Sequence, residues 1–439
     1  MDGACGWMRV GGHGAHEIRG AAPHERIGAV SGGRDNALGI YISVPFCRSK
    51  CTYCNFASGV YPAGQHERYV DRLIDDLAAA RAWSKESGAE LPRRVDTVYL
   101  GGGTPNLLAP ELIERLFSAL RGEFALDPEA EITMECAPGQ FAPGTLDAMA
   151  AAGVNRVSLG VQSFVDTEAH ASGRLHTRAL IEEDLRNLRG AGLSNVNVDL
   201  IAGLAGQTLA SWAQSLDALI ETGVPHASVY MLEVDEDSRL GRELLAGGAR
   251  YHAQAVPADD AIARMYEQAI EKLDADGLAQ YEISNFAKRG FESRHNLRYW
   301  QRRPYLGVGL DASSMLRQAN GSPRDFEPAD VLRITTTDDL AQYLAGPQPF
   351  ETTWIAADRQ HEEAWFLGLR LNAGVDLAAL EAEFGRERIE PARAVAASLA
   401  KDGLLELRGG IARLTPCGRL LSNDVFQEFL DLKSVPAGR

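Results

Sequence analysis

Three cysteines lie close together in the segment YISVPFCRSKCTYCNF, at Cys47, Cys51 and Cys54. The whole chain of 439 residues has six cysteines, so chance rarely produces this spacing. Structural zinc prefers a closed shell of four ligands, and no fourth Cys or His lies nearby in the sequence. A 4Fe-4S cluster held by three thiolates leaves one iron open to a small molecule. We therefore favour such a cluster over zinc and over free thiols.

A second motif, GGGTPN at 101–106, follows the next predicted strand. Its glycines let backbone groups approach a ligand where a side chain would clash. The motif is neither a P-loop, since no Lys-Ser/Thr pair follows, nor a dinucleotide-binding loop. A Gly-rich turn alone is usually only a turn, so the pairing with the cysteine loop carries the information. Polar residues also stand near later strand ends, at Glu135, Gln162, Arg174 and Asp199.

The elements that must position these residues alternate along the chain. Short β-branched runs are followed by amphipathic stretches, as where Tyr69, Leu73 and Leu77 form one apolar stripe. This alternation predicts an α/β fold with a parallel sheet, a partial (β/α)6 TIM-like barrel whose chemistry lies at the carboxyl ends of the strands. The predicted strands are 39–44, 96–100, 131–136, 156–161, 196–201 and 227–232.

The pattern of predicted helices and strands changes towards the end of the sequence. Beyond about residue 350, helical stretches precede two alternating runs around Gly409 and Gly410, which predicts a hairpin and a C-terminal α+β winged-helix-like domain. Acidic and basic residues are nearly balanced there, so we expect a lid or partner surface rather than a DNA site. The expected domains are a flexible tail at 1–37, the barrel at 38–260, a barrel extension at 261–350 and the C-terminal domain at 351–439.

Composition narrows the function classes. Sixty Asp and Glu against 44 Lys and Arg give a net charge of -16, which disfavours nucleic acid as a partner. No run of eighteen apolar residues occurs, and the first residues lack the order of a signal peptide. We therefore expect a cytoplasmic protein without a membrane span.

The cysteine loop, with Tyr53 before its last Cys, and the GGGTPN loop together resemble the radical S-adenosylmethionine (SAM) superfamily. The resemblance runs from about Leu38 to the end of the chain, and it implies that SAM binds the open iron of the cluster. It also implies SAM contacts from polar residues at successive strand ends. These residues are Tyr41, Tyr53, Gly102, Gly103, Thr104, Glu135, Gln162, Arg174 and Asp199.

Two features select among relatives in the oxygen-independent coproporphyrinogen III oxidase-like family. HNLRYW at 295–300 matches the HN-x-x-YW motif of HemW-type haem chaperones, which implies haem binding by His295, Tyr299 and Trp300. The alternative interpretation is a core histidine beside packing aromatics. Porphyrinogen-oxidising members carry a further Cys two places after the third cysteine, where this chain has Phe56.

The resemblance therefore implies a haem chaperone that transfers haem to an acceptor protein, through which it contacts a membrane peripherally at most. An oxygen-independent coproporphyrinogen III dehydrogenase, supplied by an electron donor, is the alternative, and a structural iron-sulfur protein is a third. The stretch DLIAGLAGQT lacks an aromatic and a proline common in the family, and Ser313 stands where a His is common. These departures affect the details of ligand contacts but leave the cysteine loop intact.

Overall fold

The computed structural model describes residues 36–319, 331–346, 351–430 and 432. The predicted tail at 1–37 lies outside this part except for its last two residues. The chain divides into two compact units, which are described separately. The barrel unit comprises Asp35–Gln280 and Ser284–Ala357, and the C-terminal unit includes Tyr281–Ile283 and Asp358–Arg439.

Six parallel strands form the centre of the barrel unit and confirm the predicted partial barrel. Further strands continue the sheet on both sides of these six. The terminal strands, β13 (Glu351–Ile355) and β8 (Ala279–Gln280), are not paired with each other in the described part of the chain, so the barrel is open. In spatial order the six are β1 (Leu38–Val44), β3 (Arg94–Gly102), β4 (Ala125–Cys136), β5 (Arg156–Gln162), β6 (Val196–Ala202) and β7 (His226–Met231).

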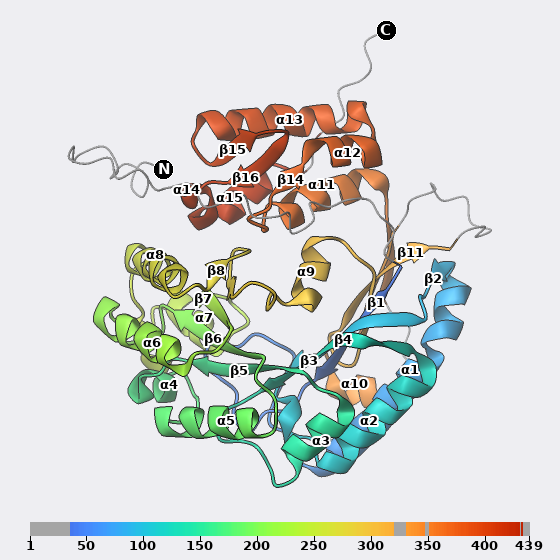
Figure 1. The fold of residues 1–439 in the computed structure, drawn as a ribbon, viewed down its shortest axis with the longest axis vertical. Coiled ribbons are helices and arrows are strands. Elements are labelled where there is room, and N and C mark those ends of the chain that lie inside the picture. Colours follow the sequence, from blue (N-terminus) through green and yellow to red (C-terminus); the bar gives the residue numbers. More distant parts are fainter. Residues whose placement is uncertain (1–35, 320–330, 347–350, 431, 433–439) are drawn as a thin grey trace. The chain divides into compact units, whose positions relative to one another are not determined.

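Helices follow these strands and cover the outside of the curved sheet (Figure 1). The predicted stripe on the first helix is confirmed, because Tyr69, Leu73 and Leu77 are fully buried. The helices between the strands are α1 (Gly64–Ser87), α2 (Pro110–Glu123), α3 (Thr145–Ala152), α4 (Asp166–Ala171), α5 (Arg178–Gly190) and α6 (Leu209–Thr222); α7 (Arg239–Leu245) and α8 (Asp259–Ala275) follow β7.

Alternate residues of each strand face two different environments, the helices on one side of the sheet and the barrel interior on the other. In β5, for example, Val157, Leu159 and Val161 are buried apolar residues, whereas Arg156 and Ser158 are polar although they are also buried. Because successive side chains of a strand point to opposite faces, one face packs against the helices and the other lines the barrel interior. The interior of this barrel is therefore polar, and the functional residues stand on that face.

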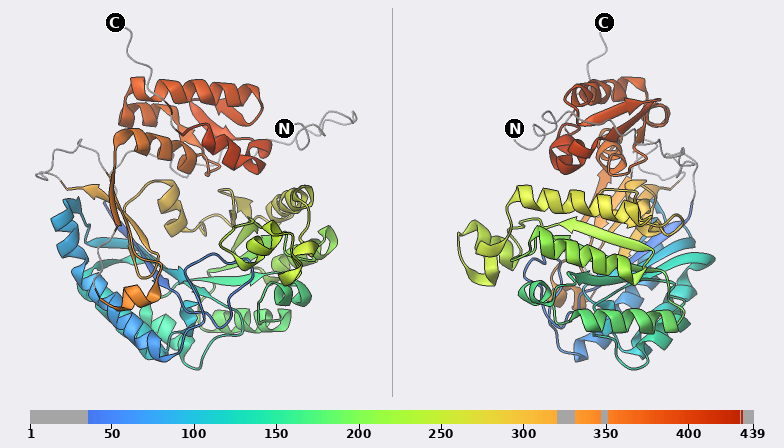
Figure 2. Two further views of the ribbon diagram at one scale, coloured as in Figure 1. Left: turned by 180° about the vertical axis from the view of Figure 1, so that it is seen from behind. Right: turned by 60° about the vertical axis from the view of Figure 1, so that its left-hand side comes forward.

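The segment after α8 extends the same sheet at both ends (Figure 2). β10 (Tyr305–Val308) pairs in parallel with β1, and β9 (Asn285–Ala287) pairs antiparallel with β7. Between them lies the short helix α9 (Arg294–Trp300). The remaining elements of this segment are β8 (Ala279–Gln280), β11 (Ser313–Gln318), β12 (Val331–Thr335), α10 (Leu340–Leu344) and β13 (Glu351–Ile355). β2 (Ala89–Glu90), which lies between α1 and β3 in the chain, pairs antiparallel with β11.

The C-terminal unit is built around a core that includes Trp365, Leu369 and Phe429. Its predicted hairpin is confirmed: Gly409 and Gly410, with φ of +59° and +79°, join two antiparallel strands. The elements are α11 (Ala357–Gly368), β14 (Val375–Asp376), α12 (Leu377–Phe384), α13 (Arg386–Lys401), β15 (Leu405–Arg408), β16 (Ile411–Leu414), α14 (Pro416–Leu420) and α15 (Ser422–Gln427). None of the described helices of either unit combines the length and hydropathy needed to cross a membrane.

Candidate functional site

The cysteine loop leaves the carboxyl end of β1 and is closed at its base by backbone hydrogen bonds. The N–H of Cys47 donates to the carbonyl of Gly59 at 2.9 Å, and the N–H of Gly59 donates to Pro45 at 2.9 Å. Within the loop, Lys50 Nζ donates to the carbonyl of Phe56 at 2.6 Å. The loop therefore has a fixed conformation although it lacks regular secondary structure.

The three thiols of this loop, Cys47, Cys51 and Cys54, are free and half-buried. Burial raises the pKa of Cys47, and the two neighbouring cysteines raise it further. In the described residues no group of His, Cys, Asp or Glu is arranged to hold a single metal ion. A 4Fe-4S cluster sets a different requirement, because each thiolate binds its own iron atom. Three accessible thiols on one ordered loop fit that donor set.

The glycine-rich loop after β3 is clamped onto the start of the cysteine loop. The N–H of Gly103 donates to the carbonyl of Val44 at 2.9 Å, and the N–H of Thr104 donates to Phe46 at 2.7 Å. A Cβ added at Gly103 would lie 2.6 Å from the Val44 oxygen, which no side chain tolerates. The Thr104 hydroxyl reaches Sγ of Cys47 at 3.8 Å. The two motifs thus form one continuous structure.

A buried carboxyl group stands beside the glycine-rich loop. Glu135, near the end of β4, accepts hydrogen bonds from the Tyr99 hydroxyl at 2.8 Å and from the N–H of Gly102 at 3.2 Å. Burial raises the pKa of Glu135 to about 7, and Asp199 raises it as well. Tyr41 stacks on Tyr99 with ring centroids 6.1 Å apart. Glu135 therefore changes charge close to neutral pH, which makes its state sensitive to a bound cation.

An arginine contacts the cysteine loop through Tyr53. Arg174 donates to the Tyr53 hydroxyl through its NH2 nitrogen at 3.0 Å and through Nε at 3.3 Å. Just before it in the chain, the carbonyl of Ser172 accepts from the N–H of Thr52 at 3.0 Å. The segment around Arg174 is therefore fastened to the cysteine loop and offers a cation next to it.

Asp199 and Gln162 complete the set at the strand ends. Asp199 accepts hydrogen bonds from Ser158 at 3.0 Å and from Asn197 at 2.7 Å, and burial raises its pKa. Gln162 is buried and has a φ of +69°, a strained conformation for a residue other than glycine. Gln162 is the last residue of β5 and Asp199 lies within β6, whereas Arg174 lies in the segment between α4 and α5 rather than at a strand end as expected from the sequence.

Several residues of this interior escaped the sequence analysis. Tyr99, Ser158 and Asn197 hold the carboxyl groups of Glu135 and Asp199 in place. A signal for them did exist in the sequence. Each is a polar residue at an alternate position within a β-branched run, and such a residue faces the interior of a barrel whose other face is apolar.

The histidine of the HNLRYW motif lies inside the barrel. His295 is only 1% exposed, and it stacks on Tyr99 with ring centroids 5.2 Å apart. Its Nδ1 is hydrogen-bonded to the Thr97 hydroxyl at 2.9 Å and its Nε2 to the Tyr299 hydroxyl at 2.9 Å. Burial lowers its pKa to about 3, helped by Arg298. In this conformation both ring nitrogens of His295 are engaged, so neither is open to haem iron.

Helix α9, which carries this motif, is anchored at both ends. At its start the carboxylate of Glu131 accepts from the N–H groups of Arg294 and His295, each at 2.9 Å. Towards its end the fully buried Arg298 forms an ion pair with Asp96. Trp300, the last residue of the helix, is half-buried. Opening His295 towards a ligand therefore requires local movement at Tyr299 rather than displacement of the whole helix.

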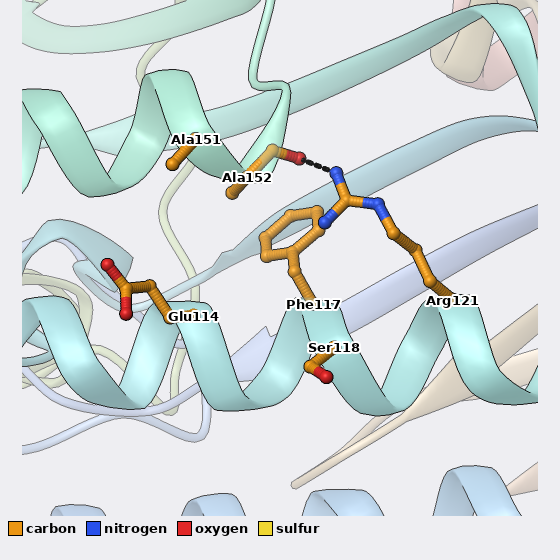
Figure 3. Close-up of a pocket in the computed structure, with 6 residues that line it drawn as sticks. All are labelled: Glu114, Phe117, Ser118, Arg121, Ala151 and Ala152. Atoms are coloured by element: carbon orange, nitrogen blue, oxygen red, sulfur yellow. Dashed lines mark hydrogen bonds between the residues drawn. The ribbon is translucent and has the colours of Figure 1, made fainter.

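A separate cavity of about 230 Å³ lies on the outer surface between α2 and α3 (Figure 3). Glu114, Phe117 and Arg121 line it, together with small residues of α3. Arg121 crosses it to donate to the carbonyl of Ala152 at 2.5 Å. This cavity contains none of the residues predicted for cofactor binding.

Family models match two parts of the chain. Residues 41–219 match the radical SAM superfamily, and residues 355–421 match the HemN C-terminal domain. A solved structure described as coproporphyrinogen III oxidase (HemN) from Escherichia coli, a radical SAM enzyme, superposes with a TM-score of 0.74. Its sequence identity is 24%, and 90% of each chain is covered. That likeness establishes the fold.

Curated relatives resemble the chain over most of its length. The protein of Bacillus subtilis named "Heme chaperone HemW" is 32% identical over 393 residues, which cover 89% of this chain and 98% of the relative. The protein of the same name from Mycobacterium tuberculosis is 35% identical over 398 residues, covering 90% and 95%. Each match thus covers about nine tenths of this chain and nearly all of the relative.

Proposed function

Because the chain belongs to the HemW family of haem chaperones within the radical SAM superfamily, we propose that it binds haem and delivers it to an acceptor protein. We propose further that it holds a 4Fe-4S cluster and SAM while it does so. The observation that carries the cluster is the closed loop with three free thiols, clamped to the glycine-rich loop through Thr104 and Cys47.

Cys47, Cys51 and Cys54 are the proposed ligands of the cluster. When bound, the cluster would supply an iron with an open coordination site for SAM. The loop's own contribution is to fix the three thiols with backbone hydrogen bonds before metal binds, so that less entropy is lost on assembly. Burial raises the pKa of Cys47, so this thiol gives up a proton when iron binds.

The proposed SAM contacts follow from charge and position. Glu135, held by Tyr99 and Gly102, offers a carboxylate to a cationic or hydroxyl group. Arg174, fastened to Tyr53, offers a guanidinium to the methionyl carboxylate. The remaining proposed contacts are Tyr41, Tyr53, Gly102, Gly103, Thr104, Gln162 and Asp199.

Haem is the proposed cargo, and the HNLRYW motif is its proposed contact. His295 offers its Nε2 to iron once the Tyr299 hydroxyl has moved away, and the rings of Tyr299 and Trp300 pack against the porphyrin. The hydrogen bond between His295 and Tyr299 thus acts as a closed state of the haem site. Delivery to the acceptor restores this bond.

Coproporphyrinogen dehydrogenation is the second candidate, and the ordered SAM-side residues Glu135 and Arg174 favour it because radical chemistry needs a bound SAM. Against it stands Phe56, at the position of the additional Cys of the oxidising members. Its side chain is 63% exposed, so it offers the cluster region an apolar surface and no ligand.

We also propose a cytoplasmic location, an unidentified acceptor protein and, where radical chemistry occurs, an electron donor.

Anaerobic titration of the purified protein with haemin tests this proposal. We expect a stable Soret band that His295→Ala weakens, whereas the matched control His170→Ala, at an exposed position on α4, leaves it unchanged. In parallel, SAM and coproporphyrinogen III are supplied with a reductant. Accumulation of 5'-deoxyadenosine without a Soret band would support the dehydrogenase instead, and silence in both assays would leave only a structural iron-sulfur protein.

A further inference from the structure

One arginine of the barrel interior is buried without a partner for its Nε. Arg156, the first residue of β5, is 1% exposed, and its Nε has no hydrogen-bond acceptor within the described residues. Buried charges in proteins are normally paired, because an unpaired charge away from water is costly. The comparable buried Arg298 follows this rule, with Asp96 and two backbone carbonyls as partners.

A second unsatisfied polar group stands directly opposite. Thr133 on β4 is the register partner of Arg156, is fully buried, and its hydroxyl also has no partner in the described structure. Two residues further along the same strands, Glu135 pairs with Ser158. Because alternate residues share a face, Arg156 and Thr133 lie on the interior face about 7 Å deeper than Glu135.

The surroundings of Arg156 concentrate its positive charge. Its guanidinium acts electrostatically on groups from four elements, namely Tyr99, Asp199, His226 and His295. Burial lowers the pKa of both histidines, so they are neutral, and Asp199 already accepts hydrogen bonds from Ser158 and Asn197. An anion at this depth of the barrel therefore finds in Arg156 a cation whose Nε–H has no acceptor among the described residues.

We propose that Arg156 and Thr133 bind a carboxylate inside the barrel, and that this carboxylate is a propionate of haem. A guanidinium next to a hydroxyl is a complementary partner for a carboxylate. Haem carries its two propionates on one edge, and His295, the proposed iron contact, stacks on Tyr99, which is the register partner of Thr133. The methionyl carboxylate of SAM has a separate partner in Arg174, beside the cysteine loop. This inference rests on the proposed haem binding.

The test compares haem with its dimethyl ester, in which both propionates are neutral. Wild-type protein is expected to bind haem at least tenfold more tightly than the ester. Arg156→Gln is expected to remove most of this preference by weakening haem binding tenfold or more while leaving ester binding unchanged. Thr133→Val is expected to weaken haem binding about threefold, and Arg156→Lys to keep part of the preference.

Arg121→Gln is the matched control, because this guanidinium lies outside the barrel on α2 (Figure 3). It should leave both affinities unchanged. Equal affinities of the wild type for haem and ester overturn the inference while the proposed function stands. An equal loss of both ligands in Arg156→Gln also overturns it, since that result marks a structural arginine. If the variant instead loses SAM in equilibrium dialysis but keeps haem, the carboxylate belongs to SAM; a wild type that binds no haem at all removes the proposed function as well.

Discussion

The Thr104 hydroxyl lies 3.8 Å from Sγ of Cys47, so the glycine-rich loop meets the cysteine loop at one of its three thiols. Two backbone hydrogen bonds, from Gly103 to Val44 and from Thr104 to Phe46, fix this contact. The loop after β3 therefore contributes to both the proposed cluster site and the proposed SAM site. Damage to it should affect both ligands together.

Gly103→Ala tests this coupling. The added methyl meets the Val44 oxygen at 2.6 Å, and relieving the clash separates the two loops. We expect iron content after anaerobic reconstitution to fall by half or more, and SAM affinity to fall at least tenfold. Gly122→Ala, on α2 with open space around it, is the control and should match the wild type. Normal iron and SAM binding in Gly103→Ala would show that the loops act independently.

Tyr299→Phe tests whether Nε2 of His295 is the group that binds haem. The variant keeps the aromatic ring and removes the hydroxyl that occupies Nε2 at 2.9 Å. A neutral hydrogen bond contributes about 0.5–1.5 kcal/mol, so its loss should tighten haem binding roughly 2- to 12-fold in a Soret titration. Tyr305→Phe, whose ring packs against Tyr299, serves as the control. Unchanged or weaker haem binding by Tyr299→Phe would exclude Nε2 as the ligand.

Glu135 predicts the pH dependence of SAM binding. Burial raises its pKa to about 7, so the carboxyl is mostly protonated below that pH. A cationic ligand group favours the carboxylate, and SAM affinity should therefore rise as pH increases from 6 to 8, by up to tenfold per unit below the pKa. Glu135→Gln should flatten this profile. A wild-type profile that is flat or falls over this range would contradict the assignment of Glu135 to a cation.

Buried neutral histidines predict a loss of stability in acid. Burial lowers the pKa of His176 to about 4, below its ordinary value of 6.5, so the unfolded chain binds more protons between these values. Each such histidine lowers the free energy of unfolding by about 1.4 kcal/mol per pH unit as pH falls from 6.5 towards 4. The raised pKa of Glu135 changes the stability in the opposite direction. The effect of His176 is therefore measured as the difference in unfolding free energy between the wild type and a His176 variant.

Urea denaturation of wild type and His176→Gln at pH 7.5 and pH 5.5 isolates this effect. The variant should lose about 1.4 kcal/mol less than the wild type between the two conditions. The exposed His170→Gln should behave like the wild type. Parallel losses in all three proteins would mean that His176 is not held in its neutral form.

The parallel barrel could be predicted because two independent signals mark each strand. One is its β-branched residues, and the other is the turn residues that follow it. The predicted run at 156–161 became β5, Arg156–Gln162, and the run at 196–201 became β6, Val196–Ala202. The extension strands could not be predicted in the same way. β10 has four residues and β9 has three, and their stability comes from pairing with β1 and β7, which local sequence does not encode.

The site shows a similar limit. Spacing along the chain was enough to group the three cysteines, since all three share one loop. It could not reveal that the Thr97 hydroxyl occupies Nδ1 of His295, because Thr97 lies on β3, far from α9 in the chain. Nor could it mark Arg156, whose significance lies in the acceptor that its buried Nε lacks. Such relationships depend on the tertiary fold.

The central claim is that Cys47, Cys51 and Cys54 hold a 4Fe-4S cluster, and iron and sulfide analysis after anaerobic reconstitution tests it most directly. The wild type should contain about four iron and four sulfide per chain, and each Cys→Ser variant should lose most of both. Cys136→Ser, at a buried cysteine on β4, should retain the wild-type content. A wild type without iron, or a Cys47→Ser, Cys51→Ser, Cys54→Ser triple variant with unchanged iron, would contradict the claim.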